Sequence, residues 1–349
     1  MLALVLWAMN SRPFFAARVE DRINSMTTKL LYRFGWKPAI VGYTGFGTPE
    51  QVRVLARVVL RPPSDLGIIR AATELMHQRG WRNFISAPLA NAEAWIMLDD
   101  EPILVSADRG GHIDVRVKNP GLEPGWHSIE VATMGESSAK VDVQIIDSNE
   151  TFGIVSDIDD TILSTWLPRP FLAAWNSFFL TEQARQAVPG MARLYQQMLA
   201  EHPGAPVIYV STGAWNTYPM VDRFLSRHGV PKGAMLLTDW GPTNTGWFRK
   251  GPDHKRTCLR ELARDLPEIS WVLVGDDGQH DPDLYGEFAT LQPKHVRARA
   301  IRELSVGEHV LAGPIQFDQN DPDRWVPEAA PEVRASDGDG LADKLRTII

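Results

Sequence analysis

The 349-residue sequence contains a single cysteine, Cys258, so no disulfide can form within the chain. Scarce cysteine is typical of proteins from reducing compartments. The sequence also lacks an excess of basic charge: 36 lysines and arginines stand against 43 aspartates and glutamates, which leaves a formal net charge of −7. That balance gives no support to nucleic acid as a partner.

Long apolar runs are missing as well, and a membrane-spanning helix needs about 20 such residues. The apolar start MLALVLWAM is shorter than this, and it lacks the basic residues and the cleavage site of a secretory signal. We therefore expect a cytoplasmic location. With 44% hydrophobic and 23% charged residues, the chain has the composition of an ordinary globular protein and is long enough for two domains.

The first expected segment, residues 1–38, contains a basic amphipathic helix over 11–37. Apolar residues recur there every three or four positions, at Phe15, Val19, Ile23, Met26, Leu30 and Phe34. Lysine and arginine outnumber the acids of this stretch. Such a helix either packs on its own protein, which is the commoner outcome, or lies in a membrane interface as a peripheral contact.

Residues 39–149 have a sequence pattern that is typical of a small β-sandwich domain. Short β-branched segments such as QVRVLARVVL, PILVSAD and KVDVQIID alternate with turns such as DRGG and NPGLEPGW. A stretch with helical character, residues 66–84, interrupts them. No catalytic or metal-binding cluster is visible in this part, so its expected role is scaffolding or partner binding.

Residues 150–315 alternate between strands and helices, which predicts an α/β domain built on a parallel sheet with helices on both faces. The remaining residues, 316–349, are acidic and rich in proline, aspartate and glycine. We expect this tail to be flexible, because it has little apolar surface to bury.

The α/β region opens with FGIVSDIDDTIL, residues 152–163, in which an apolar run ends in Asp157, Asp159 and Asp160. Carboxylates this close repel one another, and burying them costs on the order of several kcal/mol each unless something pairs them. In an open parallel sheet, ligands bind beyond the carboxyl ends of the strands. The polar residues expected at that edge are Asp157, Asp159, Asp160, Thr161, Ser211, Thr212, Gly213, Lys255, Asp276, Asp277 and Asp281.

These residue types fit phosphoryl transfer. One carboxylate can attack phosphorus, and a second can protonate the leaving alcohol and then activate water. Carboxylate oxygens hold Mg²⁺, while a hydroxyl, backbone N–H groups and a lysine bind and neutralise the phosphoryl group. Each motif alone has an ordinary explanation as a turn, a helix cap or a solvated side chain. Their joint order along the chain is what favours a phosphate site.

The order D157-I-D159-D160-T161, S211-T-G, K255 and G-D276-D277-G-Q-H-D281 resembles that of the haloacid-dehalogenase phosphatase superfamily. The longer segments FGIVSDIDDTIL, VIYVSTGAWNTYPMVDRFLSRHGVPKGAMLLTDWG and GDDGQHDPDLYGEFA look like the actin-patch-associated phosphatidate phosphatases and their bacterial relatives. The resemblance covers roughly residues 151–300. The preceding β-rich region looks, more loosely, like the domain that precedes the catalytic one in bacterial members.

The resemblance implies a Mg²⁺-dependent phosphatase with a haloacid-dehalogenase-like Rossmannoid sheet. Asp157 would be nucleophile and metal ligand, and Asp159 would be general acid/base and offer a carbonyl to the metal. Asp276 would be the further ligand, with Asp277 and Asp281 as alternatives, since many relatives carry serine at the position of Asp277. The other implied roles are loop support by Thr161, phosphate binding by Ser211 with Thr212 and Gly213, and charge stabilisation by Lys255. Trp215 and Asn216 either line the substrate site or, for the tryptophan, pack in the core.

The stretch between the acidic loop and Ser211 is too short for a large cap domain. An open site suits a bulky substrate, including a lipid head group, and the aromatic stretch over 166–180 either contacts lipid or forms a buried helix. The preferred reaction is therefore hydrolysis of phosphatidate to diacylglycerol and phosphate through an aspartyl-phosphate. Two alternatives stay open: a phosphatase for a soluble or protein phosphoester, and a membrane- or protein-binding module with a vestigial phosphatase domain.

Overall fold

The computed structural model describes residues 26–63, 86–98, 101–133, 137–165, 185–238, 251–278, 280–312 and 330–349. Four expected features lie outside these ranges: the helical positions before residue 26, the helical stretch 66–84, the aromatic stretch 166–180 and the tail residues 316–329. In the part of the chain that is described, no helix is long and apolar enough to span a membrane.

The chain has the mixed α/β composition that the sequence predicts, and it divides into two compact units. The first unit combines Met1–Ile145 with Ala214–Met220 and Thr238–Lys250. The second combines Ile146–Gly213, Val221–Leu237 and Gly251–Ile349. The main division falls between Ile145 and Ile146, and the described residues Ala214–Met220 belong to the first unit.

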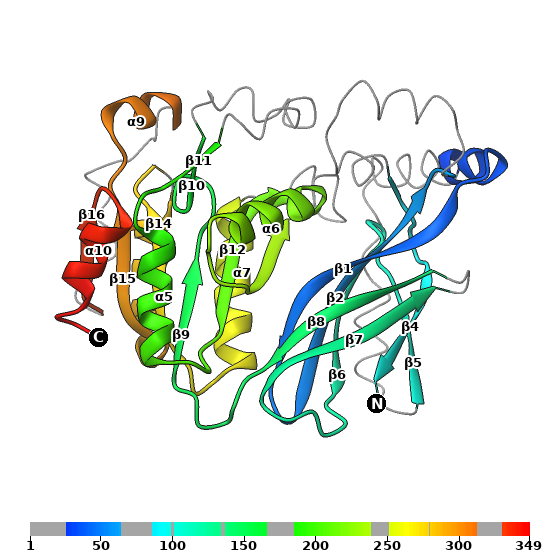
Figure 1. The fold of residues 1–349 in the computed structure, drawn as a ribbon, viewed down its shortest axis with the longest axis horizontal. Helices are drawn as coiled ribbons and strands as arrows, with labels where there is room; N and C mark the ends of the chain where they lie inside the picture. The colour runs from blue at the N-terminus through cyan, green and yellow to red at the C-terminus, as the bar shows by residue number, and fades with distance from the viewer. Residues whose placement is uncertain are drawn as a thin grey trace. The chain divides into compact units, whose positions relative to one another are not determined.

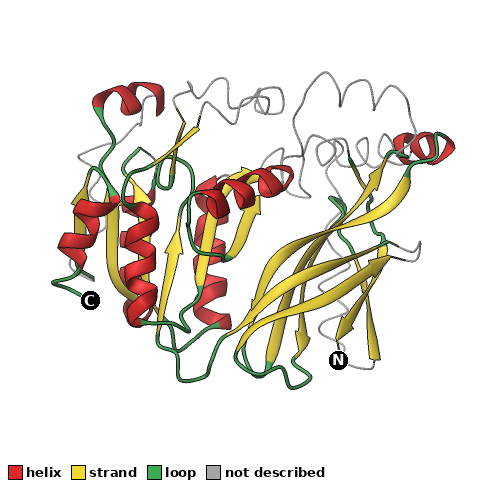
Figure 2. Cartoon of the chain, in the orientation of Figure 1, coloured by secondary structure: helices red, strands yellow, loops and turns green. Residues whose placement is uncertain are grey.

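The first unit is built on one eight-stranded mixed sheet (Figures 1 and 2). Its strands are β1 (Lys37–Gly47), β2 (Gln51–Arg61), β3 (Ala87–Pro88), β4 (Glu93–Leu98), β5 (Glu101–Ser106), β6 (His112–Lys118), β7 (Gly125–Thr133) and β8 (Ser138–Ile145). They follow the order β3-β2-β1-β8-β7-β4-β5, with β6 also paired to β2. The pairs are antiparallel except β1 with β8, which is parallel.

The hydrogen bonding of this unit differs from the two separate sheets of the expected sandwich. The long strands β1 and β2 pair with each other, and their register shifts between Tyr43 and Phe46. A bulge of this kind bends a strand and lets it pass from one layer to the next. The strands enclose an apolar core that includes Val54, Ile96 and Val131, all fully buried.

The second unit contains a six-stranded sheet with the order β13-β12-β9-β14-β15-β16. Its strands are β9 (Phe152–Ser156), β12 (Val207–Ala214), β13 (Ala234–Thr238), β14 (Ser270–Asp276), β15 (Val296–Arg302) and β16 (Glu332–Ala335). The pairs β12–β9, β9–β14, β14–β15 and β15–β16 are parallel. A separate two-stranded sheet joins β10 (Leu163–Thr165) to β11 (Arg185–Ala187).

Helices alternate with these strands (Figure 2). They are α5 (Met191–Glu201), α6 (Tyr218–Arg227), α7 (Gly251–Asp265), α8 (Asp281–Leu291), α9 (Val306–Ala312) and α10 (Gly338–Leu345), with 3₁₀ turns η4 (Trp215–Thr217) and η5 (Pro293–His295). The strand that follows β9 in this sheet, β12, lies on one side of β9. The strand that follows β14, β15, lies on the opposite side of β14. The strand order therefore reverses between β9 and β14, and in open α/β sheets the crevice at such a reversal is where ligands bind.

Strand β9 is suited to the centre of this sheet because all five of its residues are buried. Strands covered on both faces read as continuous apolar runs rather than as alternating patterns. Strand β14 is similar, with every residue from Trp271 to Asp276 buried. Both apolar runs end in an aspartate, so the sheet brings charged groups to its carboxyl edge.

The expectation of a flexible tail is wrong for residues 332–345. Strand β16 extends the sheet in parallel beside β15, and α10 packs against α5. Asp337 caps α10 by accepting a hydrogen bond from the Gly340 amide at 2.9 Å, and Leu341 and Leu345 are buried. Few apolar residues suffice here, because an existing sheet edge and an existing helix supply the partners.

Candidate active site

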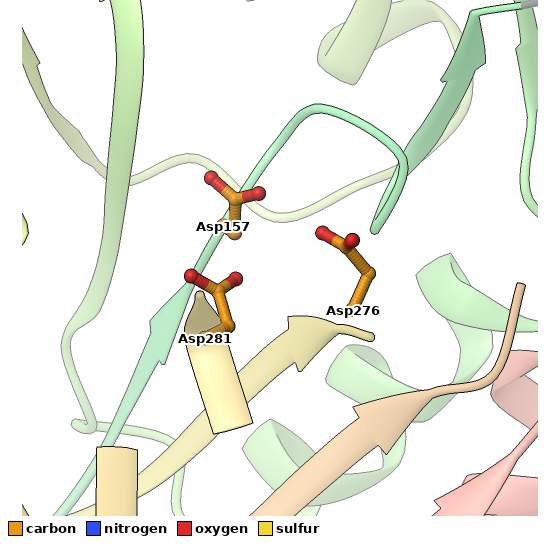
Figure 3. Close-up of side chains that lie close together, drawn as sticks. All are labelled: Asp157, Asp276 and Asp281. Atoms are coloured by element: carbon orange, nitrogen blue, oxygen red, sulfur yellow. The ribbon is translucent and has the colours of Figure 1, made fainter. Parts of the chain in front are cut away.

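Three carboxylates converge at the carboxyl edge of the six-stranded sheet (Figure 3). Asp157 directly follows β9, Asp276 is the last residue of β14, and Asp281 is the first residue of α8. Each residue offers one carboxylate oxygen, and these three oxygens all lie within 4.8 Å of one another. All three are almost completely buried, with at most 1% of their surface exposed.

Lys255 joins this cluster from α7. Its Nζ lies 3.1 Å from Oδ1 of Asp157 and 2.5 Å from Oδ1 of Asp281. Burial alone would lower the pKa of Lys255, but the charges of Asp157 and Asp281 raise it above its usual value. The ammonium group therefore stays charged and draws two carboxylates to one point.

The second oxygens of Asp157 and Asp281, both Oδ2, are buried without a hydrogen-bond partner. Burial raises the pKa of Asp157, an effect that Lys255 opposes and that the neighbouring carboxylates reinforce. Burial and the charge of Asp281 raise the pKa of Asp276 to about 8. One lysine does not neutralise three carboxylates, so the cluster fits a divalent cation, and its all-oxygen donors are those that Mg²⁺ prefers.

The loop after β9 is a tight turn that directs its side chains to different partners. The Ile162 amide donates to the Ile158 carbonyl at 3.0 Å, and Asp160 has a positive φ of 59°. Asp159 accepts a hydrogen bond from the Ser211 hydroxyl at 3.0 Å. Thr161 donates to Oδ2 of Asp276 at 3.2 Å. The loop thereby links the ends of β9, β12 and β14.

Ser211 lies in β12 and is buried. Its Oγ accepts a hydrogen bond from the Gly213 amide at 2.9 Å while its hydroxyl donates to Asp159. Thr212 lies between Ser211 and Gly213 in the same strand. The structure thus places the predicted phosphate-binding segment beside the predicted general acid/base.

Asp277 is turned away from the cluster, although it adjoins Asp276 in sequence. Its Oδ1 accepts a hydrogen bond from the Leu304 amide at 2.9 Å and lies 3.3 Å from Nε2 of His309. Of the three candidates for the further ligand, Asp276 and Asp281 therefore lie with Asp157. The Asp159 carboxylate, bonded to Ser211, lies outside this group.

The close approach of α8 to β14 depends on a glycine. A Cβ at Gly275 would lie 2.5 Å from Oδ2 and 2.8 Å from Cβ of Asp281. No side chain fits in this space without displacing the first turn of α8. Gly275 thus permits Asp281 to reach the cluster.

Trp215 and Asn216 form part of η4, in the segment that belongs to the first unit. The Trp215 ring stacks on Tyr43 of β1 with centroids 4.7 Å apart, and it lies 5.5 Å from the His112 ring. Of the two roles left open by the sequence, this contact favours packing for the tryptophan.

Two further contacts support the acidic loop and were not predicted from the sequence. The Ser156 hydroxyl donates to the Asp157 carbonyl at 2.6 Å and lies 2.7 Å from the Tyr195 hydroxyl. Arg302 donates through Nη1 to the Asp160 carbonyl at 2.7 Å. Their positions at the end of a strand were a weak signal for Ser156 and Arg302, and nothing in the spacing singled out Tyr195.

Comparison with known proteins finds similarity in the same part of the chain. Residues 152–303, which carry the acidic cluster, match the model of a family described as phosphatidate phosphatase APP1, catalytic domain. This segment is similar to the APP1 catalytic domain. The resemblance predicted from the motifs is therefore confirmed for the APP1-like segment, and that segment is related to phosphatase-type hydrolases.

Two curated proteins are similar to the same region. An uncharacterized protein of Schizosaccharomyces pombe is 25% identical over 164 residues, which are 47% of this chain and 27% of that protein. The phosphatidate phosphatase APP1 of Saccharomyces cerevisiae is 24% identical over 151 residues, which are 43% of this chain and 25% of that protein. The chain thus spans about a quarter of the length of the curated relatives it matches.

Among solved structures, a carbohydrate acetylesterase from Xanthomonas citri aligns over 87% of this chain and 72% of its own, with 10% identity and a TM-score of 0.28. A score this low carries no argument about fold or function.

Proposed function

We propose that the chain is a Mg²⁺-dependent phosphatase that hydrolyses phosphomonoesters through an aspartyl-phosphate, with phosphatidate as the preferred substrate. The observation that carries the proposal is the convergence of Asp157, Asp276 and Asp281 at the edge of a parallel sheet, with Lys255 paired to Asp157 and Asp281, within the APP1-like segment. The strand order and the acidic motifs support a haloacid-dehalogenase-like fold for the second unit.

In the first proposed step, a carboxylate oxygen of Asp157 attacks phosphorus and the bond to the substrate alcohol breaks. Asp159 donates the proton that the leaving oxygen needs. In the second step, Asp159 takes a proton from water, and the resulting hydroxide attacks the phosphorus of the aspartyl-phosphate. Inorganic phosphate leaves and Asp157 is regenerated as a carboxylate.

The other residues of the site bind and orient. Asp157, Asp276 and Asp281 would hold the cation, with the Asp159 carbonyl as the further ligand that the family resemblance implies. When bound, Mg²⁺ would offset the negative charge of the carboxylates and of the phosphoryl oxygens. Ser211 holds the Asp159 carboxylate in place and accepts from the Gly213 amide, so on substrate binding these two donors would exchange their present partners for phosphate oxygens. Lys255 stabilises the charge that develops on the phosphoryl group.

The choice of phosphatidate rests on the named relative and on a candidate lipid-facing surface. In the helix over 26–33 and just after it, Met26, Leu30 and Phe34 follow one another every fourth position and are 71%, 50% and 63% exposed. Lys29 and Arg33 lie between them in the sequence, and Lys37 follows Phe34. Exposed apolar and basic side chains in alternation favour binding to an anionic membrane surface. We therefore propose a cytoplasmic enzyme that meets its lipid substrate by peripheral contact.

A phosphoester panel tests the proposal. Purified full-length protein is assayed with and without Mg²⁺ on phosphatidate in mixed micelles, on small aromatic phosphate esters and on a phosphopeptide. We expect Mg²⁺-dependent release of phosphate, fastest from phosphatidate, and its loss in Asp157→Asn and Asp159→Asn with retained folding by circular dichroism.

The other outcomes are distinct. A preference for the small esters or the phosphopeptide would replace the lipid by a soluble or protein substrate. Wild-type protein without activity on any phosphoester would contradict the proposed reaction and favour a binding module with a vestigial site. Full activity of Asp157→Asn would contradict the role of Asp157 as the nucleophile.

A further inference from the structure

The side chain of Arg302 connects the acidic loop to a buried glutamate, and neither residue belongs to the proposed reaction. Arg302 ends β15, is 7% exposed, and spreads its three nitrogens over three partners. Nη1 donates to the Asp160 carbonyl at 2.7 Å, Nε to the Ser336 carbonyl at 3.2 Å, and Nη2 to Oε1 of Glu308 at 2.8 Å. A planar guanidinium with fixed donors is well suited to holding several acceptors in one geometry.

Glu308 is anchored as firmly as the arginine. It lies in the first turn of α9, 9% exposed, where it forms a capping box with Ser305. Its Oε2 accepts from the Ser305 amide at 2.9 Å and from the Ser305 hydroxyl at 2.8 Å, and its Oε1 accepts from the Ser164 hydroxyl at 2.9 Å. Ser164 belongs to β10, just after the acidic loop. The pair therefore holds both the loop and the strand that follows it.

The bond to Asp160 falls where the acidic loop is strained. Asp160 has a φ of 59°, in the left-handed region that few residues other than glycine adopt. Such a conformation persists only when its surroundings impose it. Asp160 lies between Asp159, which accepts a hydrogen bond from Ser211, and Thr161, which donates one to Asp276. Its conformation therefore sets the directions of both neighbouring side chains.

The backbone of Arg302 also reaches the second acidic loop. The Asp277 amide donates to the Arg302 carbonyl at 3.0 Å, and Asp276 pairs with Arg302 in the register of β14 and β15. One residue thus contacts the loop after β9 by its side chain and the loop after β14 by its carbonyl.

We propose that Arg302 and Glu308 form a positioning pair, which holds Asp160 in its left-handed conformation so that Asp157 and Asp159 stand ready for phosphoryl transfer. The inference rests on the proposed phosphatase function and adds two residues that act through the acidic loop. Misplacement of catalytic groups by about 1 Å can cost on the order of 100-fold in rate. Loss of the pair is therefore expected to lower kcat about 10- to 100-fold and to change KM little.

The test compares Arg302→Met and Glu308→Gln with a matched control, Arg299→Met. Arg299 lies in the same strand and is 3% exposed, but it pairs with Glu332 at 2.8 Å and donates to the Ala330 carbonyl, both in the C-terminal segment. Full-length proteins are assayed with Mg²⁺ on a small phosphate ester. Amide hydrogen exchange of the peptide that contains residues 157–163 reports the order of the loop without reference to activity.

We expect Arg302→Met and Glu308→Gln to lower kcat and to speed exchange in this peptide, while Arg299→Met keeps the wild-type kcat and exchange. Glu308→Gln, which keeps one acceptor oxygen, should have the smaller effect, and it decides the matter if Arg302→Met does not fold. Wild-type kcat and exchange in the Arg302 and Glu308 variants, or equal losses in the Arg299 variant, would overturn the inference. If the wild-type protein hydrolyses no phosphoester, the proposed function fails, and the exchange comparison alone decides whether the pair orders the loop.

Discussion

Asp281 and Asp277 carry the same carboxylate group, but the contacts of the two groups differ. Asp281 is buried against Lys255 with Oδ2 unpartnered, whereas Asp277 bonds to the Leu304 amide and lies beside His309. The two residues are four positions apart, and each follows the apolar run of β14. They therefore form a natural pair for testing which carboxylates hold the cation.

Substitution of Asp281 by asparagine is expected to raise the Mg²⁺ concentration needed for half-maximal activity about tenfold or more, because the cluster loses a charged oxygen ligand. Asp277→Asn should leave that concentration within about twofold of wild type, since an amide oxygen can still accept from Leu304. Activity titrated with Mg²⁺, and isothermal calorimetry of Mg²⁺ binding, measure the difference. Equal loss in both variants would show that Asp277 also contributes to the cation site.

At this scale the sequence predicted the types of residue but not their directions. Asp157, Lys255 and Asp276 could be placed from the ends of apolar strands and from the start of a helix. The choice between Asp277 and Asp281 could not be made, because it depends on the turn after β14 and on how closely α8 approaches that strand. The linear sequence does not encode that distance in any local pattern.

The junction of β14 with α8 is the element on which the geometry of the acidic cluster depends. Gly275→Ala would place a methyl group 2.5 Å from Oδ2 of Asp281. We expect the first turn of α8 to shift, with a loss of about 1–3 kcal/mol of stability from overpacking and a larger proportional loss of Mg²⁺-dependent activity. Chemical denaturation and Mg²⁺ titration measure the two effects.

Gly204→Ala provides the control, because a Cβ there meets only Oε2 of Glu150, the end of a flexible side chain, at 3.0 Å. Its stability and activity should stay close to wild type. An unchanged Mg²⁺ requirement in Gly275→Ala would show that the cluster does not depend on this close approach.

Helix α9 makes the stability of the protein depend on pH through Glu308. Burial alone would raise the pKa of Glu308, but hydrogen bonds from Arg302, Ser305 and Ser164 outweigh it and lower the pKa from 4.5 to about 2. A carboxylate with a lowered pKa in the folded state stabilises the protein above its unfolded pKa. That contribution is lost as the pH falls from about 4.5 toward 2.

Glu308→Gln should therefore destabilise the protein by about 1–2 kcal/mol at pH 7, less than the full pKa shift implies because solvent screens part of the pair. The difference from wild type should shrink as the pH is lowered from 5 toward 3. Urea unfolding at several pH values measures it. A difference that is constant over this range would show that the charge of Glu308 does not contribute.

Elements with strong apolar patterns were predictable, and those that depend on a tertiary partner were not. The runs that became β9, β12 and β14 are buried over five or more consecutive residues and read directly as strands. Strand β16 is only four residues long and pairs with β15 at the edge of the sheet. Its composition alone predicted a flexible tail, because the stabilising partner lies about 30 residues earlier in the chain.

At the scale of the whole molecule, the described residues contain two apolar cores that belong to different parts of the chain. One is the apolar cluster enclosed by the eight-stranded sheet, and the other surrounds the six-stranded sheet that carries the acidic residues. The sequence predicted a boundary near residue 150 from the change in its pattern there. It did not predict the return of Ala214–Met220 to the first unit, because that assignment depends on contacts such as the stacking of Trp215 on Tyr43.

Separate cores predict separate responses to a ligand that binds only one of them. Ile96 is fully buried in the first core, and Ile96→Ala should cost that core about 2–5 kcal/mol. Leu262, in α7, is equally buried and serves as the matched site in the second unit. In scanning calorimetry, Mg²⁺ should raise the midpoint of one unfolding transition, which Leu262→Ala lowers and Ile96→Ala leaves in place. A single transition that both substitutions lower equally and that Mg²⁺ shifts as a whole would show that the two cores unfold as one cooperative body.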